Sequence, residues 1–220
     1  ARRTLVTQTA DFLGPASCAR LAASGATVIA SAEPPTDPDL PARLAAAHGP
    51  VDALVLNLAI PAPSTPALEV GDAEWREAFA WLVEPLPRFL RAFAPAMVER
   101  GAGKLLVLGS ASALRGMKRA STYSAARGAQ LAWVQAVGVE LAPKGLQVNA
   151  IAQNFVDNPT YFPPEVQQHP RFVERLAREV PLGRLVGADE DAHLVAYLCS
   201  AAADCFVGQV FPGAGGWAVR

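Results

Sequence analysis

Residues 103–110 read GKLLVLGS, a continuously apolar run that begins at a glycine and ends at a serine. A short apolar run of this kind is typical of a strand that is buried on both faces of a parallel sheet. It is followed at 121–141 by STYSAARGAQLAWVQAVGVEL, which reads as a long helix. A buried strand followed by a helix is the repeating unit of an α/β fold.

The same alternation continues in both directions along the chain. Further strands are expected at 4–7, 26–31, 51–59, 146–153 and 208–216, and helices at 14–25, 39–49, 72–101, 169–181 and 189–201. Gly25 should end its helix, and the helix at 72–101 should bend near Pro85. We therefore predict a three-layer α/β fold with a doubly wound, Rossmann-like parallel sheet. Its ligand crevice should lie beyond the carboxyl ends of the strands.

Length and composition limit the classes of protein to consider. The 220 residues are 51% hydrophobic and 18% charged, which predicts one globular domain over residues 1–220. A formal net charge of -1 leaves no basic surplus to neutralise phosphates, so we expect neither a nucleic-acid nor a membrane partner. The apolar runs are too short to span a bilayer.

Targeting and redox signals indicate a cytoplasmic protein. The first residues, ARRTLVT, lead directly into a strand pattern without the apolar stretch of a signal peptide. The three cysteines, Cys18, Cys199 and Cys205, are an odd number without metal-like spacing. We therefore expect no disulfide framework and no metal site. The three histidines are scattered singly, which favours positions at the surface or at the edge of the core over metal ligation.

Three residues have a spacing that favours proton transfer. Ser110 ends the strand at 103–110, Tyr123 follows thirteen residues later, and Arg127 follows one helical turn after Tyr123. A hydroxyl at the carboxyl end of a strand points into the crevice, and residues four apart share a helix face. The permanently charged guanidinium favours the tyrosinate. Taken singly, the three could be a helix cap, a core residue and a solvated charge, but together they are predicted to be catalytic.

The loop after the first strand lacks most of the glycines that a dinucleotide site needs. Glycines let the backbone turn tightly and approach a pyrophosphate at a helix N-terminus. The loop QTADFLG, residues 8–14, retains only Gly14. Phe12 should fill space that a nucleotide would otherwise occupy; the alternative is that its ring folds inward as an ordinary core aromatic.

With these residues, the sequence resembles the short-chain dehydrogenase/reductase superfamily over essentially its whole length. Ser110, Tyr123 and Arg127 stand where that superfamily has Ser, Tyr and the Lys of Tyr-x-x-x-Lys. VDALVLNLAI at 51–60 resembles its N-N-A-G strand, with Asn57 retained. VNAIAQN and VGQVFPGAGGW resemble its V-N-x-I-x-P-G and G-Q-x-x-x-x-x-G-G segments.

The departures from that pattern concern the nicotinamide site. The superfamily loop T-G-x-x-x-G-x-G has glycine where Gln8 and Phe12 stand, and its ribose-binding lysine is Arg127. The chain is also apolar around Leu82, where an asparagine is usual. The resemblance therefore implies a member that works without a cofactor.

One branch of the superfamily, the halohydrin dehalogenases, shares these departures. Its members have Tyr-x-x-x-Arg, a serine thirteen residues upstream and an aromatic residue in the former glycine loop. QNFVDNPTYFPPE at 153–165 resembles their halide-site loop. The residues to which the resemblance assigns halide or nucleophile binding are Phe12, Gln153, Asn154, Phe155 and Val156.

The resemblance implies a carbon–halide lyase. Such an enzyme converts vicinal haloalcohols reversibly into epoxides and hydrogen halide, with Tyr123 as general base. In reverse it opens epoxides with halide, azide, cyanide or nitrite. Two alternatives stay open: an NAD(P)-dependent oxidoreductase with a degenerate glycine loop, and a non-catalytic member that has lost its cofactor.

The helices at 72–101 and 121–141 also predict assembly. Both carry few charges and are apolar on more than one side. A helix of this kind must bury a second face. In the resembled superfamily these helices pair between subunits, so we expect a homo-oligomer, most simply a tetramer with two-fold axes.

Overall fold

The computed structural model, which covers residues 2–219, contains one six-stranded sheet with the order β2-β1-β3-β4-β5-β6. All neighbouring strands are parallel. The strands are β1 Arg3–Val6, β2 Thr27–Ala30, β3 Ala53–Asn57, β4 Gly103–Ser110, β5 Leu146–Gln153 and β6 Val210–Gly213. The predicted doubly wound, Rossmann-like fold is confirmed. From β1 the chain goes outward to β2 at one edge, then crosses back to β3 and continues outward to β6 at the other edge.

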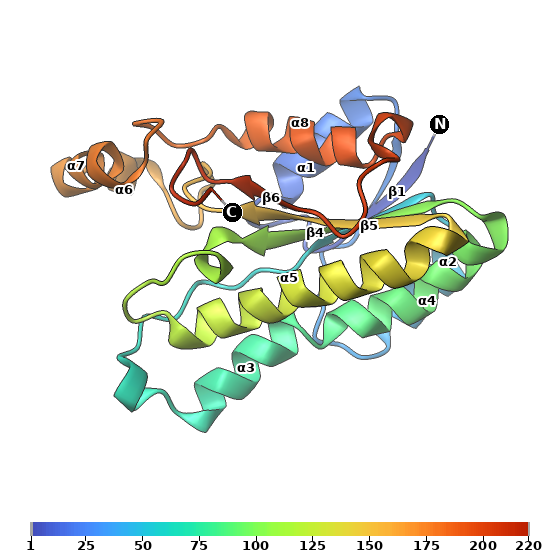
Figure 1. The fold of residues 1–220 in the computed structure, drawn as a ribbon, viewed down its shortest axis with the longest axis horizontal. Helices are drawn as coiled ribbons and strands as arrows, with labels where there is room; N and C mark the ends of the chain where they lie inside the picture. Colours follow the sequence, from blue (N-terminus) through green and yellow to red (C-terminus); the bar gives the residue numbers. More distant parts are fainter. Residues whose placement is uncertain (1, 220) are drawn as a thin grey trace.

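Helices cover both faces of the sheet, as Figure 1 shows: α1 and α8 lie on one side, and α2, α4 and α5 on the other. The helices are α1 Gly14–Ala23, α2 Leu40–His48, α3 Asp72–Leu82, α4 Pro85–Arg100, α5 Ser121–Leu141, α6 Pro164–Gln167, α7 Pro170–Glu179 and α8 Ala188–Leu198. The short α6 and α7 lie beyond the carboxyl ends of the strands (Figure 1). They therefore lie at the edge where a ligand crevice is expected.

The two central strands explain why the pattern of GKLLVLGS predicted a strand. Every residue of β3 and β4 is buried. Along β4, Leu105 and Val107 pack into the core beneath α4 and α5, whereas Leu106 and Leu108 pack into the core beneath α8. Successive side chains of a strand point to opposite faces, so a strand covered on both sides must be apolar throughout.

Two predicted helix boundaries have clear backbone causes. Gly25 has φ +83 and follows the end of α1, as expected for a glycine that stops a helix. The predicted bend near Pro85 is a complete break between α3 and α4. Pro85 has no N–H to continue α3, but its fixed φ suits the first residue of α4.

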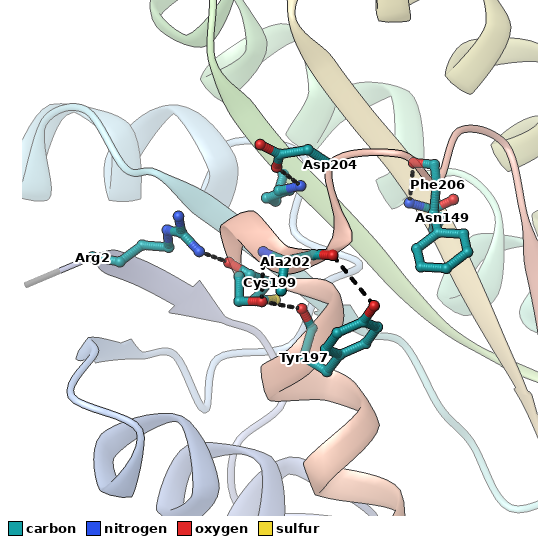
Figure 2. Close-up of polar contacts among 9 residues, drawn as sticks. Arg2, Asn149, Tyr197, Cys199, Ala202, Asp204 and Phe206 are labelled. Atoms are coloured by element: carbon teal, nitrogen blue, oxygen red, sulfur yellow. Dashed lines mark hydrogen bonds and ion pairs between the residues drawn. The ribbon is translucent and has the colours of Figure 1, made fainter.

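The segment after α8 makes polar contacts with the sheet and with Arg2, which directly precedes β1 (Figure 2). Arg2 donates to the carbonyl of Cys199, and the Asn149 side chain donates to the carbonyl of Phe206 at 2.9 Å. Lys104, a β4 residue, forms an ion pair with Asp204. The Lys104 side chain is 7% exposed, whereas the Asp204 side chain is 63% exposed.

Removing the carboxylate of this ion pair should cost more stability than removing the amine. Asp204→Ala leaves a buried ammonium without its partner, which should lower the free energy of unfolding by about 1–3 kcal/mol. Lys104→Met replaces the buried chain with an apolar one and should change stability less. Urea unfolding of both variants tests this, and a larger loss for Lys104→Met would contradict it.

The structure also bears on membrane spans, on metal sites and on the exposure of the histidines and Trp75. Within residues 2–219, no helix is long and apolar enough to cross a membrane, and no group of three or more His, Cys, Asp or Glu side chains could hold a metal. The three histidines, His48, His169 and His193, are exposed. Trp75 of α3 is 44% exposed and stacks on Phe79. The homo-oligomer remains a prediction.

Candidate active site

A cavity of about 340 Å³ lies where the strands end. Its wall combines the loop after β1, the end of β4, one face of α5 and the loop after β5. All eight residues predicted to act in catalysis or anion binding line it: Phe12, Ser110, Tyr123, Arg127, Gln153, Asn154, Phe155 and Val156. The fold therefore brings together residues that are up to 144 positions apart in the sequence, from Phe12 to Val156.

Tyr123 lies in the first turn of α5 and is almost fully buried, 7% exposed. Its hydroxyl is 3.4 Å from the hydroxyl of Tyr161, which in turn donates to the carbonyl of Ile60. Burial raises the pKa of Tyr161, and the neighbouring Tyr123 raises it further. Tyr161 is therefore held as a phenol and is a poor proton acceptor.

Arg127 is buried rather than solvated, which excludes the alternative of a surface charge. It is 3% exposed, and its Nη1 donates to the carbonyls of Leu58 and Leu108 at 2.8 and 3.1 Å and to Gln130 Oε1 at 2.9 Å. Its Cζ lies 5.0 Å from the centroid of the Tyr123 ring. The guanidinium thus contacts the ring face, as in cation–π pairs, and keeps one positive charge beside the phenol.

Ser110 is the last residue of β4 and combines two of the roles considered for it. Its Oγ accepts from the backbone N–H of Ser112 at 3.2 Å, which caps the short 3-10 helix Ala111–Ala113. The same Oγ is 3.0 Å from Ser112 Oγ and lines the cavity. With Ser112 supplying these contacts, the Ser110 hydroxyl is held in place, and its own hydrogen can be given to a ligand oxygen.

The loop after β1 keeps a glycine-like backbone although its glycines are replaced. Gln8 has φ 48 and Phe12 has φ 52, in the left-handed region that costs side-chain-bearing residues roughly 1–2 kcal/mol. Gln8 offsets this cost by two side-chain hydrogen bonds of 2.8 Å with the backbone of Ala59. Asn57 Nδ2 also donates to the Gln8 carbonyl at 2.9 Å. The remaining glycine, Gly14, is required because its backbone lies close to that of Gln8. A Cβ at position 14 would lie 2.5 Å from the Gln8 carbonyl oxygen.

Phe12 serves both as core aromatic and as cavity wall. It is 8% exposed and belongs to the core cluster on the α1 and α8 side of the sheet. Its ring centroid is 5.4 Å from that of Tyr161, and Phe12 lines both this cavity and a neighbouring one of about 470 Å³. The ring is therefore packed in the core, as in the alternative considered for it, and it also forms part of the cavity wall. That it takes the place of a nucleotide remains a prediction.

The turn after β5 has few free hydrogen-bond donors. Two of its amides already have partners: Asn154 N–H donates to the carbonyl of Gly213 at 3.1 Å, and Phe155 N–H donates to Asn154 Oδ1 at 2.9 Å. Within residues 2–219, the Val156 N–H and the Asn154 side-chain NH₂ have no hydrogen-bond acceptor. These two donors are the ones in the turn that remain available to a ligand.

Two further polar residues contribute to the site and were not singled out from the sequence. Tyr161 lies in the loop PTYFPPE, residues 159–165. An aromatic residue among prolines was the only feature of the sequence that could have indicated its role. Asp191 of α8 accepts a hydrogen bond from Gln153, and no local pattern links the two.

Comparison with known proteins gives the family. A family model described as Enoyl-(Acyl carrier protein) reductase matches residues 37–218. Galactitol 2-dehydrogenase (L-tagatose-forming) of Cereibacter sphaeroides is 33% identical over 221 aligned positions, covering 100% of this chain and 86% of the relative. The chain belongs to the short-chain dehydrogenase/reductase superfamily.

Solved structures of other superfamily members have the same fold. A protein described as a dehalogenation enzyme has a TM-score of 0.90 at 31% identity, and the alignment covers 99% of this chain and 98% of that one. A halohydrin dehalogenase bound to ethyl (2S)-oxiran-2-ylacetate has a TM-score of 0.91 at 29% identity, with the same coverage. A short-chain dehydrogenase/reductase from Mycobacterium ulcerans reaches 0.90 at 22% identity, which shows the fold alone.

The superfamily's nicotinamide does not fit the residues of this chain. The Gln8 side chain is bonded to Ala59, and the buried Phe12 ring stands where the superfamily loop has its second glycine. A pyrophosphate needs close backbone approach at these positions.

Proposed function

We propose that this protein is a halohydrin dehalogenase that interconverts vicinal haloalcohols and epoxides without a cofactor. One observation carries the proposal: the buried Tyr123–Arg127 pair and Ser110 share a cavity with Phe12 and the turn at 153–156. Ser110 and Tyr123 thus provide for proton transfer at one side of the cavity. At the other side, Phe12 and the turn leave room for a ligand smaller than a dinucleotide.

The forward reaction begins with the haloalcohol hydroxyl bound between Ser110 and Tyr123. Ser110 donates a hydrogen bond to the substrate oxygen, and the Tyr123 oxygen takes its proton. The oxygen then attacks the neighbouring carbon from the side opposite the halogen. The new carbon–oxygen bond closes the epoxide as the carbon–halogen bond breaks, and halide leaves with the bonding electrons. Because the attack is intramolecular, positioning provides much of the catalysis.

Arg127 and Tyr161 both contact Tyr123 where this proton is transferred. The Arg127 guanidinium holds its positive charge over the face of the Tyr123 ring, with Cζ 5.0 Å from the ring centroid. Tyr161 has one hydroxyl hydrogen, which it gives to the Ile60 carbonyl. After Tyr123 has taken the substrate proton, its O–H can point to the Tyr161 oxygen 3.4 Å away. In the reverse reaction Tyr123 returns the proton to the opening epoxide.

The departing anion is proposed to lie between Phe12 and the turn at 153–156. Val156 N–H and the Asn154 side-chain NH₂ are free to donate to it, while Phe12 and Phe155 limit access by water. The likeness to two structures described as dehalogenating enzymes supports this assignment. Halide and other small anions would share the site.

An NAD(P)-dependent oxidoreductase is the competing function, favoured by the galactitol 2-dehydrogenase relative. We predict that the purified protein binds neither NADH nor NADPH saturably at millimolar concentration, because Gln8 and Phe12 occupy the pyrophosphate path. Fluorescence titration with each dinucleotide tests this, with the double variant Gln8→Gly/Phe12→Gly as the control that reopens the loop. Saturable binding by the unmodified protein would revive the oxidoreductase.

A further inference from the structure

A buried pair of polar side chains, Gln153 and Asp191, lies behind the proposed anion site. Gln153 ends β5 and lines the cavity, and its Nε2 donates to Asp191 Oδ2. Asp191 lies in the first turn of α8 and is 4% exposed. Its Oδ1 is buried and has no hydrogen-bond partner within residues 2–219. The carboxyl group is therefore enclosed, with the Gln153 amide as its hydrogen-bonding neighbour.

The enclosure of this carboxyl disfavours its charged form. Burial raises the pKa of Asp191 to about 7, against the opposing effect of the Gln153 hydrogen bond. Asp191 therefore changes its protonation state near neutral pH, where most aspartates stay ionised.

The charged groups near Asp191 are paired with one another and not with its carboxyl group. Asp189, Glu190 and His193 share α8 with Asp191, Arg184 precedes that helix, and Cys18 and Arg20 lie on the neighbouring α1. Arg20 pairs with Asp189, Arg184 with Glu190, and His193 contacts Asp189. Burial raises the pKa of the Cys18 thiol, which keeps it neutral. β5 and β6 carry no titratable residue. The charged or titratable residues that line the same cavity as Gln153 are Tyr123, Arg127, Tyr161 and Arg175.

We propose that the Asp191 proton orients the Gln153 amide and thereby couples anion binding to proton uptake. An ionised carboxylate can only accept, so it takes the Nε2–H and leaves the Oε1 acceptor for the cavity. A protonated carboxyl can donate to Oε1, and the amide then turns by half a rotation and presents its NH₂ to the cavity. The terminal torsion of glutamine is broad and roughly two-fold, which makes this turn accessible.

The sign of the pH effect follows from the two amide orientations. An anion is repelled by Oε1 and bound by the NH₂, so it favours the protonated carboxyl. Affinity should be full below the titration of Asp191 and should be lost as pH rises through it. If only the protonated form binds, the anion should bind about tenfold more weakly at about pH 8 than at about pH 6.

The test is a bromide titration by calorimetry at about pH 6 and about pH 8, at constant ionic strength. The inference rests on the proposed anion site, and Tyr123 also faces the cavity. Tyr123→Phe is therefore the reference protein, so that no tyrosinate can repel the anion. The Asp191→Asn variant in this background has a side-chain NH₂ that can donate to Gln153 Oε1 at every pH, and it cannot titrate. Gln153→Met removes the amide and serves if the Asn variant does not fold.

We expect the reference protein to lose about tenfold in bromide affinity over this range. The Asp191→Asn and Gln153→Met variants should show a pH-independent affinity. A reference protein with pH-independent affinity, or variants that keep the full pH dependence, would overturn the inference. If the unmodified enzyme still releases halide from a haloalcohol in that case, the proposed function stands. If it neither releases halide nor binds bromide, the proposed function fails, and this inference fails with it.

Discussion

Replacing Tyr123 with phenylalanine should lower the kcat for halide release by about a hundredfold to ten-thousandfold, the usual contribution of a positioned general base. The Phe ring retains the packing of the phenol and its contact with the Arg127 guanidinium. Within residues 2–219, the Tyr123 hydroxyl has one hydrogen-bonding partner, the Tyr161 hydroxyl at 3.4 Å. The free energy of unfolding should therefore change little. Steady-state halide release and thermal unfolding of the same preparation measure both effects.

Tyr161→Phe is the matched control, because it removes a second phenol from the same cavity. Tyr161 is held as a phenol by burial and gives its hydrogen to the Ile60 carbonyl, so it is not the proton acceptor. Its replacement should reduce kcat much less than removal of the Tyr123 hydroxyl. If Tyr123→Phe keeps substantial activity, or the two variants lose equal activity, Tyr123 is not the general base.

Replacing Arg127 with methionine should reduce both activity and stability. The buried acceptors now bonded by Nη1 are the Leu58 and Leu108 carbonyls and Gln130 Oε1. Leaving a buried acceptor unsatisfied costs about 1–3 kcal/mol, and partial relaxation should bring the total loss of unfolding free energy to about 2–4 kcal/mol. The rate should also fall because no positive charge remains beside the Tyr123 ring.

Arg127→Lys separates the charge from the hydrogen-bonding geometry. Lysine keeps a positive charge but replaces the planar guanidinium with a compact ammonium. It should recover part of the activity that Arg127→Met loses, and less of the stability. Activity and urea unfolding of both variants test this. Wild-type rate and stability in Arg127→Met would show that the pair has no role in the reaction.

The parts of the fold and site that depend on local spacing could be predicted from the sequence. Apolar runs indicated the strands, and the four-residue interval between Tyr123 and Arg127 placed both on one helix face. The loss of glycine at Gln8 and Phe12 indicated a changed loop. The positive φ of Gln8 could not be predicted, because the Gln8 side chain is held by hydrogen bonds with Ala59, which is 51 residues away in the sequence.

The interactions that complete the site depend on how distant segments meet. Tyr161 bonds Ile60 across 101 residues, and Gln153 meets Asp191 across 38. Neither separation matches a helical or strand period, so no local pattern could indicate them. The turn at 153–156 was predicted to lie in the crevice. Which of its amides remain available depends on the register of β5 against β6, which supplies the Gly213 carbonyl.

The central claim is that this cavity displaces halide and does not transfer hydride. The most direct measurement incubates the purified protein with a vicinal bromohydrin in the absence of any nicotinamide and follows bromide, protons and organic product together. We expect equal amounts of bromide, protons and epoxide, and no ketone. Bromide release that does not exceed the spontaneous rate, with oxidation of the alcohol only after NAD⁺ or NADP⁺ is added, would contradict it.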